Sequence, residues 1–138
     1  MNKTDLSSYQ NNWYKPGPKW KKALWYISNV LLFRPAWNVS SNFKVRLLRI
    51  VGATIGKGVV IKQKVNIKYP WLLEVGDYCW IGEEVWIDNL AKVTLENNVC
   101  ISQGALLQCG NHDYKKSTFD LIVQPITLKE GSWVGAKA

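Results

Sequence analysis

The chain has 138 residues, 47% of them hydrophobic and 20% charged, which indicates one folded domain and excludes an intrinsically disordered chain. Its formal net charge of +8 is unevenly spread, because residues 1–68 contain 13 basic and 1 acidic side chain whereas residues 69–138 contain 5 and 9. The basic front half favours an anionic partner such as a phosphate group, a membrane surface or an acidic glycan.

Several other classes are excluded by simple features. The longest apolar stretch, residues 23–33, is shorter than the roughly 20 residues that a bilayer requires, and Arg34 follows it instead of a signal-peptide cleavage site. The three cysteines form no CxxC pair and are odd in number, so we expect a reducing, cytoplasmic location. A single histidine excludes a site with several histidine ligands, and we expect no metal. The basic half contains no recognisable reading motif, so we expect no nucleic-acid partner.

Residues 1–52 are predicted to form an N-terminal arm followed by a helical cap. The first 20 or so residues indicate an irregular arm. A helix is then predicted from four apolar residues at steps of four, three and four, namely Trp20, Leu24, Ile27 and Leu31. Arg34-Pro35 ends this helix. A second helix is predicted with Ser40 or Ser41 as its N-cap and Gly52 as its C-cap. Its apolar stripe is Phe43, Leu47 and Ile50.

Two interpretations of these helices remain open. In one, they cover the open end of the structure that follows. In the other, Trp20 and Trp25 together with Lys21 and Lys22 form an interfacial membrane patch.

From residue 53 to residue 138 the chain repeats. Four segments align, with starts 20, 20 and 33 positions apart: Ile55–Ile61, Val75–Ile81, Leu95–Ile101 and Leu128–Val134. Two further columns keep the same register: Ile67, Ile87 and Leu107, and Leu73, Val93 and Ile126. Within each unit the aliphatic residues fall every six positions, which predicts three short strands per turn and about 4.8 Å between turns.

These columns predict an all-β solenoid, in which each inward aliphatic column is buried by the neighbouring turns. A sandwich of ordinary alternating strands is the alternative, but it does not require several columns to hold one register.

The repeats resemble those of the hexapeptide-repeat acyltransferases, which fold as left-handed parallel β-helices. From Ile55 to Ala136, more than half of the chain, the sequence resembles one branch, the colanic acid biosynthesis acetyltransferases. Four longer segments carry this resemblance: Asn66–Leu73, Val85–Leu90, Cys100–Ala105 and Asn111–Tyr114. The hexapeptide pattern alone specifies a fold and only weakly a reaction, whereas the longer segments are more specific.

The third step of the repeat admits 13 extra residues between Leu107 and Ile126. A solenoid can place them only outside the stack, which predicts an extruded loop at about residues 108–125. This loop contains His112, and the resemblance implies that His112 is catalytic, because family members carry their catalytic histidine there. An imidazole, with an ordinary pKa of about 6.5, can accept the proton of a hydroxyl as its oxygen attacks a thioester. Cys109 is an alternative nucleophile that direct attack does not need.

Residues around the loop are candidates for binding the acceptor. They are Asn111, Asp113 and Tyr114, with Asp113 also a candidate to orient the imidazole; the alternative for each is a turn, packing or solvent-facing role. In related acetyltransferases, polar residues from the turn below the histidine loop face the acceptor, which implies the same for Asp88 and Asn89.

The cofactor side of the site is expected further along the chain. Relatives place a tryptophan near the thiol end of coenzyme A, which implies that Trp133, with Gly135 and Ala136, binds the cofactor. The alternative is a surface aromatic residue stacked above Trp80, because both hold the same register position.

The resemblance implies an acetyl-CoA-dependent O-acetyltransferase that acts on a sugar or lipid-linked saccharide in exopolysaccharide biosynthesis, as a homotrimer with active sites between subunits. We expect a cytoplasmic enzyme with a peripheral contact at the inner membrane. The chain stops at Ala138, before the turns that in family members supply much of the coenzyme A groove. An inactive or truncated solenoid that acts as a scaffold or interaction module is therefore the alternative.

Overall fold

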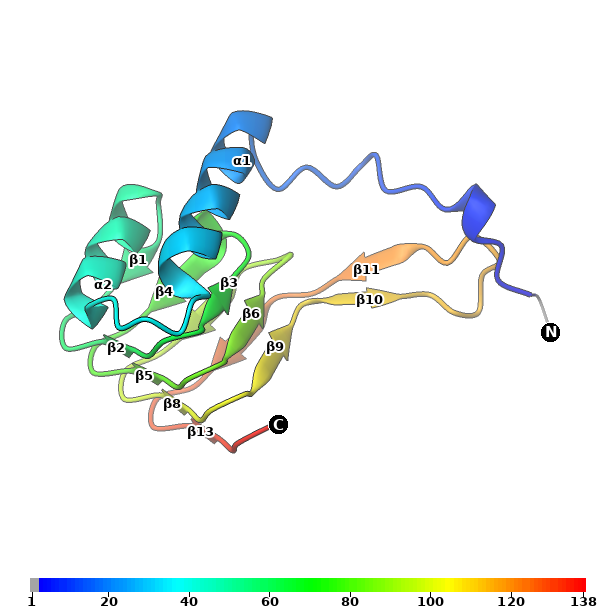
Figure 1. Ribbon diagram of the computed structural model, residues 1–138. Coiled ribbons are helices and arrows are strands. Elements are labelled where there is room, and N and C mark those ends of the chain that lie inside the picture. Colours follow the sequence, from blue (N-terminus) through cyan, green and yellow to red (C-terminus); the bar gives the residue numbers. More distant parts are fainter. Residues whose placement is uncertain (1–2) are drawn as a thin grey trace.

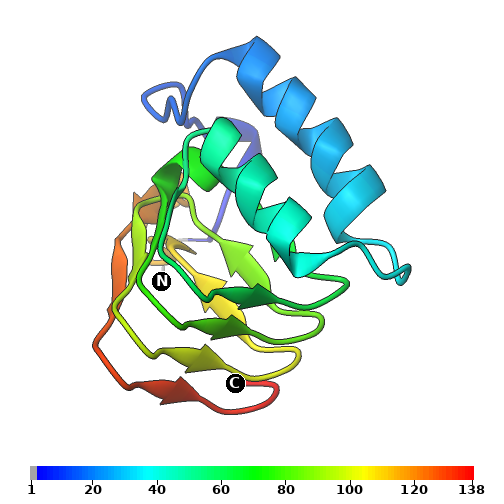
Figure 2. The same ribbon diagram turned by 90° about the vertical axis from the view of Figure 1, so that its left-hand side faces the viewer.

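The computed structural model describes residues 3–138, and three parallel sheets form its main body (Figures 1 and 2). The first sheet has the order β1 (Thr54–Ile55), β4 (Leu73–Val75), β7 (Val93–Leu95) and β12 (Ile126–Leu128). The second has the order β2 (Val60–Ile61), β5 (Trp80–Ile81), β8 (Cys100–Ile101) and β13 (Trp133–Val134). The third has the order β3 (Asn66–Ile67), β6 (Trp86–Asp88) and β9 (Leu106–Gln108).

The strand register is the one that the sequence repeats predict. The chain visits the three sheets in turn and then returns to the first, so that equivalent residues of successive repeats pair as parallel neighbours. The observed columns are Ile55, Val75, Leu95 and Leu128; Ile61, Ile81, Ile101 and Val134; Ile67, Ile87 and Leu107; and Leu73, Val93 and Ile126. Parallel strands in stacked sheets are compatible with a β-helix.

The inward columns form the hydrophobic core. Ile81 and Ile87 are fully buried, and only the last repeat, with Val134, is partly open. At the corner after β5, a Cβ on Gly82 would lie 2.7 Å from the backbone nitrogen of Gln103 and 2.8 Å from the carbonyl oxygen of Ile101. Close stacking at this corner therefore requires glycine at position 82.

Two helices lie at the end of the stack that begins with β1 (Figure 2). Helix α1 (Lys19–Ser28) continues into the π-helical turn η2 (Asn29–Phe33), and α2 (Ser41–Ile50) follows. The indole of Trp25 is buried and donates a hydrogen bond to the carbonyl of Ile67 at 2.7 Å. Lys44 is also buried, and its ammonium donates to the carbonyl of Lys62 at 2.7 Å. Both helices thus anchor on the first repeat.

The helix positions agree with the prediction, but the buried faces do not. Ser40 is the N-cap of α2, its hydroxyl accepting from the amide of Phe43, and Gly52 follows the helix with a φ of 109°. The predicted stripe of α1, Trp20, Leu24, Ile27 and Leu31, is 53–69% exposed. On α2, Phe43 and Ile50 are likewise exposed.

The physical reason is that α1 carries apolar residues on two faces, so periodicity alone could not select the buried one. The opposite face, with Trp25 and Phe33, packs on the repeats. The predicted membrane patch is corrected accordingly: Trp25 is part of the core, and Lys21 lies 4.8 Å from the centre of the Trp71 ring.

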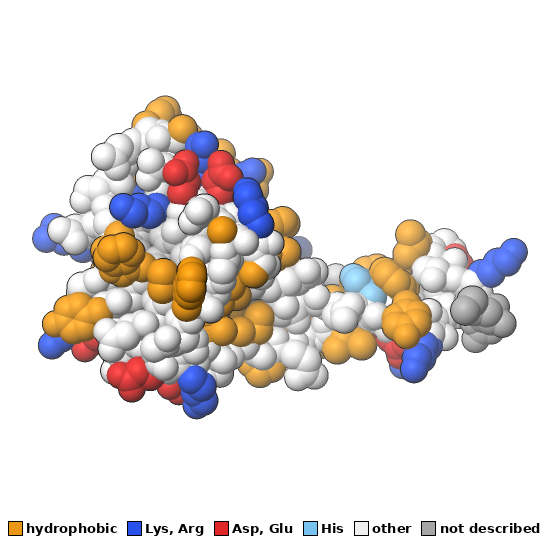
Figure 3. Space-filling view, turned by 90° about the horizontal axis from the view of Figure 1, so that it is seen from below, with side chains coloured by type: hydrophobic (Ala, Val, Ile, Leu, Met, Phe, Trp, Pro, Cys, Tyr) orange, Lys and Arg blue, Asp and Glu red, His pale blue; other side chains and the backbone are white. Residues whose placement is uncertain are grey.

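The inserted segment forms a hairpin that projects from the body with the N-terminal arm beside it (Figures 1 and 3). Strands β10 (Gly110–His112) and β11 (Leu121–Val123) pair antiparallel. The sequence predicted the extruded loop but not these strands. The 3₁₀ turn η1 (Leu6–Ser8) lies near the hairpin tip, where the amide of Asp5 donates to the carbonyl of Ser117 at 2.8 Å. A second 3₁₀ turn, η3 (Pro70–Leu72), precedes β4.

Candidate active site

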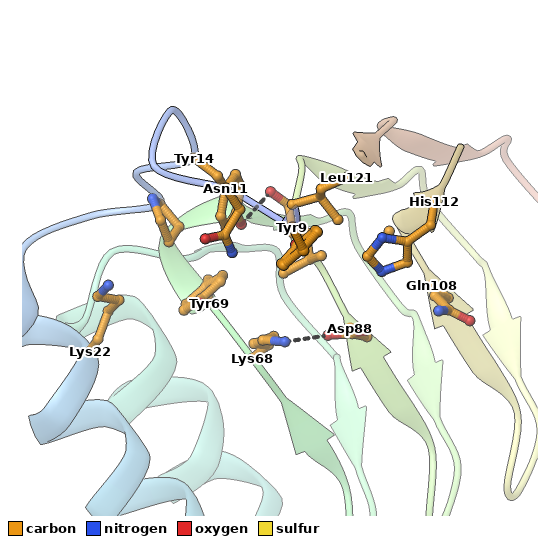
Figure 4. A pocket seen from close by; sticks show the side chains of 13 residues that line it. Tyr9, Asn11, Tyr14, Lys22, Lys68, Tyr69, Asp88, Gln108, His112 and Leu121 are labelled. Carbon is orange, nitrogen blue, oxygen red and sulfur yellow. Dashed lines mark hydrogen bonds and ion pairs between the residues drawn. The ribbon is translucent and has the colours of Figure 1, made fainter. Parts of the chain in front are cut away.

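A pocket of about 560 Å³ lies where the third sheet, the hairpin and the N-terminal arm meet (Figure 4). Its floor is formed by residues that follow β3, or end β6 and β9, namely Lys68, Asp88 and Gln108. His112 comes from the hairpin, and Tyr9 faces it from the arm. Segments far apart in the sequence therefore build one cavity.

His112 is held by three contacts. Its Nδ1 lies 2.9 Å from the carbonyl oxygen of Phe119, and its ring stacks on the Phe119 ring with 4.3 Å between centroids. Tyr9 meets the imidazole edge-on at 5.7 Å. Because a carbonyl oxygen only accepts, Nδ1 carries the hydrogen, and the neutral ring keeps its lone pair on Nε2. This arrangement defines one tautomer that can act as a base.

The hairpin turn positions the accepting carbonyl. The amide of Asp113 donates to the carbonyl of Asp120 at 2.8 Å, and Lys116 forms an ion pair with Asp120 at 2.9 Å. Phe119 has a φ of 51°, in the left-handed region that non-glycine residues rarely occupy. This conformation turns the hairpin at the residue whose carbonyl contacts the imidazole.

The residues next to His112 do not enter the pocket. Asn111 accepts a hydrogen bond from the backbone amide of His112, and the Asp113 carboxylate accepts one from the amide of Lys115 at 3.1 Å. Tyr114 is 72% exposed. The partner of the imidazole is thus the Phe119 carbonyl and not the candidate Asp113 carboxylate, and the local contacts of Asn111 and Asp113 correspond to the turn alternative.

Asp88 and Asn89 separate at the edge of the third sheet. Asp88 lines the pocket and lies 3.1 Å from the ammonium of Lys68, although its shielded Oδ1 is not aligned for a hydrogen bond with any described group. Asn89 is 0% exposed, accepts from the amide of Tyr69 at 2.9 Å and donates to its carbonyl at 2.7 Å. Asn89 therefore holds the backbone of Tyr69 instead of reaching the acceptor as expected.

Tyrosines form the wall nearest the arm. The hydroxyl of Tyr14 donates to the carbonyl of Leu90 at 2.7 Å, which fastens the arm to the second repeat. Burial, followed by the neighbouring Tyr69 and Asp88, raises the pKa of Tyr14 well above its ordinary value. Burial also raises the pKa of Tyr69. Both hydroxyls therefore stay protonated near neutral pH and can act as donors.

The thiol of Cys109 is poorly suited to nucleophilic attack. Cys109 is buried beneath the pocket edge, with its sulfur 3.7 Å from the carbonyl of Ala91, and burial raises the pKa of its thiol. Across residues 3–138, no three side chains of the His, Cys, Asp or Glu types gather as metal ligands would.

The expected cofactor residues lie on another part of the chain. Trp133 is 75% exposed on the second sheet, pairs with Cys100, and donates from its indole to the hydroxyl of Ser102 at 2.8 Å. Cys100 separates it from Trp80, so the two tryptophans share a register position without being direct neighbours. Trp133, Gly135 and Ala136 do not line the pocket that contains His112.

Sequence reasoning missed the pocket residues that come from the arm and from Phe119. No repeat or motif marks Tyr9 and Tyr14, because they reach the pocket only through long-range packing. Lys68 and Gln108 could have been found, because they occupy the register position of Asp88 in the neighbouring repeats.

Parallel strands that repeat every 20 residues, with His112 on an inserted hairpin beside a pocket, agree with the hexapeptide-repeat acyltransferases that the sequence resembles. The chain is 35% identical over 131 residues, 94% of its length and 72% of the relative's, to WcaF of Escherichia coli (strain K12), which is named as a colanic acid biosynthesis acetyltransferase. WcaF of Shigella flexneri matches with the same identity and coverage. The chain belongs to this acetyltransferase branch of the family, and it is an acetyltransferase. No family profile matches the chain, and no solved structure matches it.

Proposed function

We propose that the pocket binds a saccharide acceptor and that His112 acts as the general base in transfer of an acetyl group from acetyl-CoA to a sugar hydroxyl. The observation that carries this proposal is the contact between His112 Nδ1 and the Phe119 carbonyl, which leaves Nε2 of the neutral ring free to accept a proton. The names of the WcaF relatives support a role in exopolysaccharide biosynthesis.

The proposed reaction needs one base and no covalent enzyme intermediate. Nε2 of His112 takes the hydroxyl proton as the acceptor oxygen attacks the thioester carbonyl carbon. The tetrahedral adduct then collapses, the carbon–sulfur bond breaks, and the imidazolium returns the proton to the leaving thiolate. The high pKa and burial of Cys109 support direct attack over an acyl-cysteine route.

The composition of the pocket suits a sugar. Tyrosine rings present flat apolar faces to the C–H side of a pyranose, while Asp88, Lys68 and Gln108 offer acceptors and donors to its hydroxyls. Asp88 is the strongest candidate for a hydrogen bond to the acceptor, because it lines the pocket and its carboxylate is held by the Lys68 ammonium, 3.1 Å from Oδ1.

The proposed architecture is a left-handed β-helix at residues 53–138, capped by the arm and helices of residues 1–52 and interrupted by the insertion at 108–125. We further propose a homotrimer with the active site between subunits. Because Trp133, Gly135 and Ala136 lie outside the pocket of their own chain, a neighbouring chain is the proposed source of the cofactor-binding residues. A lipid-linked saccharide acceptor would place the enzyme at the cytoplasmic face of the inner membrane.

The test is acetyl transfer by a His112→Asn variant, measured as free coenzyme A released from acetyl-CoA in the presence of a panel of saccharides. We expect kcat/KM to fall by about 10²–10⁴-fold, which is the usual contribution of a positioned base, while the unfolding transition stays in place. Lys115→Ala, an exposed change in the same hairpin, is the matched control and should keep wild-type turnover. Undiminished transfer in His112→Asn, or its loss in Cys109→Ala alone, would refute the proposed mechanism.

A further inference from the structure

Helix α1 presents an apolar face to the outside of the molecule. Trp20, Leu24 and Ile27, with Leu31 of the continuing turn η2, follow one another along this face, and each exposes more than half of its surface. The opposite face of the helix is occupied by Trp25 and packs on the first repeat (Figure 2). We call these four outward residues the α1 stripe. Contiguous exposed apolar surface of this kind marks an interaction site.

The chain segment that carries the α1 stripe contains only positive charge. The sequence contains no acidic residue between Asp5 and Glu74. Lys19 and Arg34, at the two ends of the stripe, are exposed, and neither forms an ion pair with a carboxylate in the described part of the chain. The partner must therefore combine an apolar layer with negative charge.

We propose that the α1 stripe docks on an anionic lipid bilayer. A helix that lies in the membrane interface buries an apolar face containing tryptophan and leucine in the acyl boundary, while lysine and arginine at its flanks meet acidic headgroups. The stripe and its flanking cations have this composition. The docking needs no unfolding, because the face that holds α1 on the repeats is the opposite one.

Charge decides between a bilayer and a second copy of this chain. Two α1 stripes brought together would oppose Lys19 and Arg34 of one copy to the same cations of the other, with no carboxylate on the same segment to compensate. An anionic surface meets both requirements at once, and salt should weaken its attraction.

Docking would also orient the pocket. Lys22, on the same helix but turned away from the stripe, lines the cavity that contains His112 (Figure 4). A membrane-bound α1 therefore keeps one wall of the cavity close to the lipid surface. The binding itself is independent of the proposed chemistry at His112, so the two can fail separately.

The test is sedimentation of the full chain with vesicles of phosphatidylcholine alone or of phosphatidylcholine mixed with phosphatidylglycerol. The wild-type protein should pellet with the anionic vesicles at about 0.01 M salt and be released at about 1 M, where the Debye length falls from about 30 Å to 3 Å. Lys19→Glu should lower the partition coefficient by roughly 30-fold, because each charge lost near the surface costs roughly 5-fold. Trp20→Ser should lower it by about tenfold or more.

Matched controls separate the stripe from general charge and apolarity. Lys115→Glu makes the same charge change at the hairpin tip, and Trp80→Ser removes a similarly exposed tryptophan from the second sheet; both should bind vesicles like the wild type. The proposal is overturned if the wild type stays in the supernatant with anionic vesicles, if the controls lose binding as strongly as the stripe variants, or if sedimentation velocity shows that Trp20→Ser dissociates an oligomer through which this face is covered.

Discussion

Asn89 offers a direct measure of how the third sheet supports the pocket. Its side chain is fully buried and forms hydrogen bonds with both the amide and the carbonyl of Tyr69, at 2.9 and 2.7 Å. In Asn89→Ala the amide of Tyr69 loses its partner, whereas its carbonyl still accepts from the amide of Leu72 at 2.9 Å. The unsatisfied amide costs about 1–3 kcal/mol and the second lost hydrogen bond about 1 kcal/mol, so the variant should lose about 2–4 kcal/mol of unfolding free energy. The pocket wall at Tyr69 would also lose its support.

The assay is urea unfolding followed by tryptophan fluorescence, with kcat/KM measured under conditions where the variant remains folded. Asn97→Ala is the matched control, because Asn97 sits on an exposed corner and accepts a single hydrogen bond, from the amide of Asp77 at 2.8 Å. It should lose less than about 1 kcal/mol. If the unfolding free energy of Asn89→Ala lies within about 0.5 kcal/mol of the wild-type value, the supporting role assigned to this side-chain amide is refuted.

The core and the arm give two further predictions. Ile87→Ala removes a fully buried side chain from the middle repeat and should cost about 2–5 kcal/mol in urea unfolding; a cost below about 1 kcal/mol would contradict the buried column. Tyr14→Phe should cost about 1 kcal/mol at neutral pH through the lost bond to Leu90. Burial raises the folded-state pKa of Tyr14, so the stabilisation from its protonated hydroxyl is complete below about pH 10 and declines above it. The difference in unfolding free energy between the wild type and Tyr14→Phe should therefore shrink as the pH is raised above about 10. A difference that does not depend on pH would contradict this.

The sequence predicted the register of the stacked strands, because each inward column contains an equivalent aliphatic residue from several repeats. Ile61, Ile81 and Ile101 stand 20 residues apart and pair as expected, and the 33-residue step to Val134 is absorbed by the hairpin without a slip. A one-residue error in register would turn every side chain of a strand to the other face of its sheet. Agreement between several columns is therefore strong evidence for the register.

The faces of the helices could not be predicted in the same way. Helix α1 and the turn η2 that continues it carry Trp25 and Phe33 on one side and Trp20 and Leu24 on the other, so two apolar stripes with helical spacing compete. The buried side is decided by what the first repeat offers, including the Ile67 carbonyl that accepts from the Trp25 indole. Such a long-range hydrogen bond leaves no periodic trace.

The candidate site was only partly visible in the sequence. His112 was marked by its place in the insertion and by the resemblance, and the structure gives it a pocket. Its contacts with Tyr9 and Phe119 depend on the fold of the arm and on the tight hairpin turn, neither of which has a repeat signal. Asp88 and Asn89 are adjacent in sequence but point to opposite faces of the chain, so neighbours with similar chemistry separate into a pocket residue and a structural one.

The residues of the pocket floor are evenly spaced, because they come from successive repeats. Lys68, Asp88 and Gln108 occupy one position in three successive repeats, and neighbouring strands lie about 4.8 Å apart, so the floor spans roughly 10 Å in two fixed steps. Adding or deleting a whole 20-residue repeat in this region would keep every inward column in register. It would also carry His112 one step away from, or towards, Tyr69 and the arm. Acceptor size in such a protein can therefore change in discrete increments, by repeat number, while the packing of each repeat stays the same.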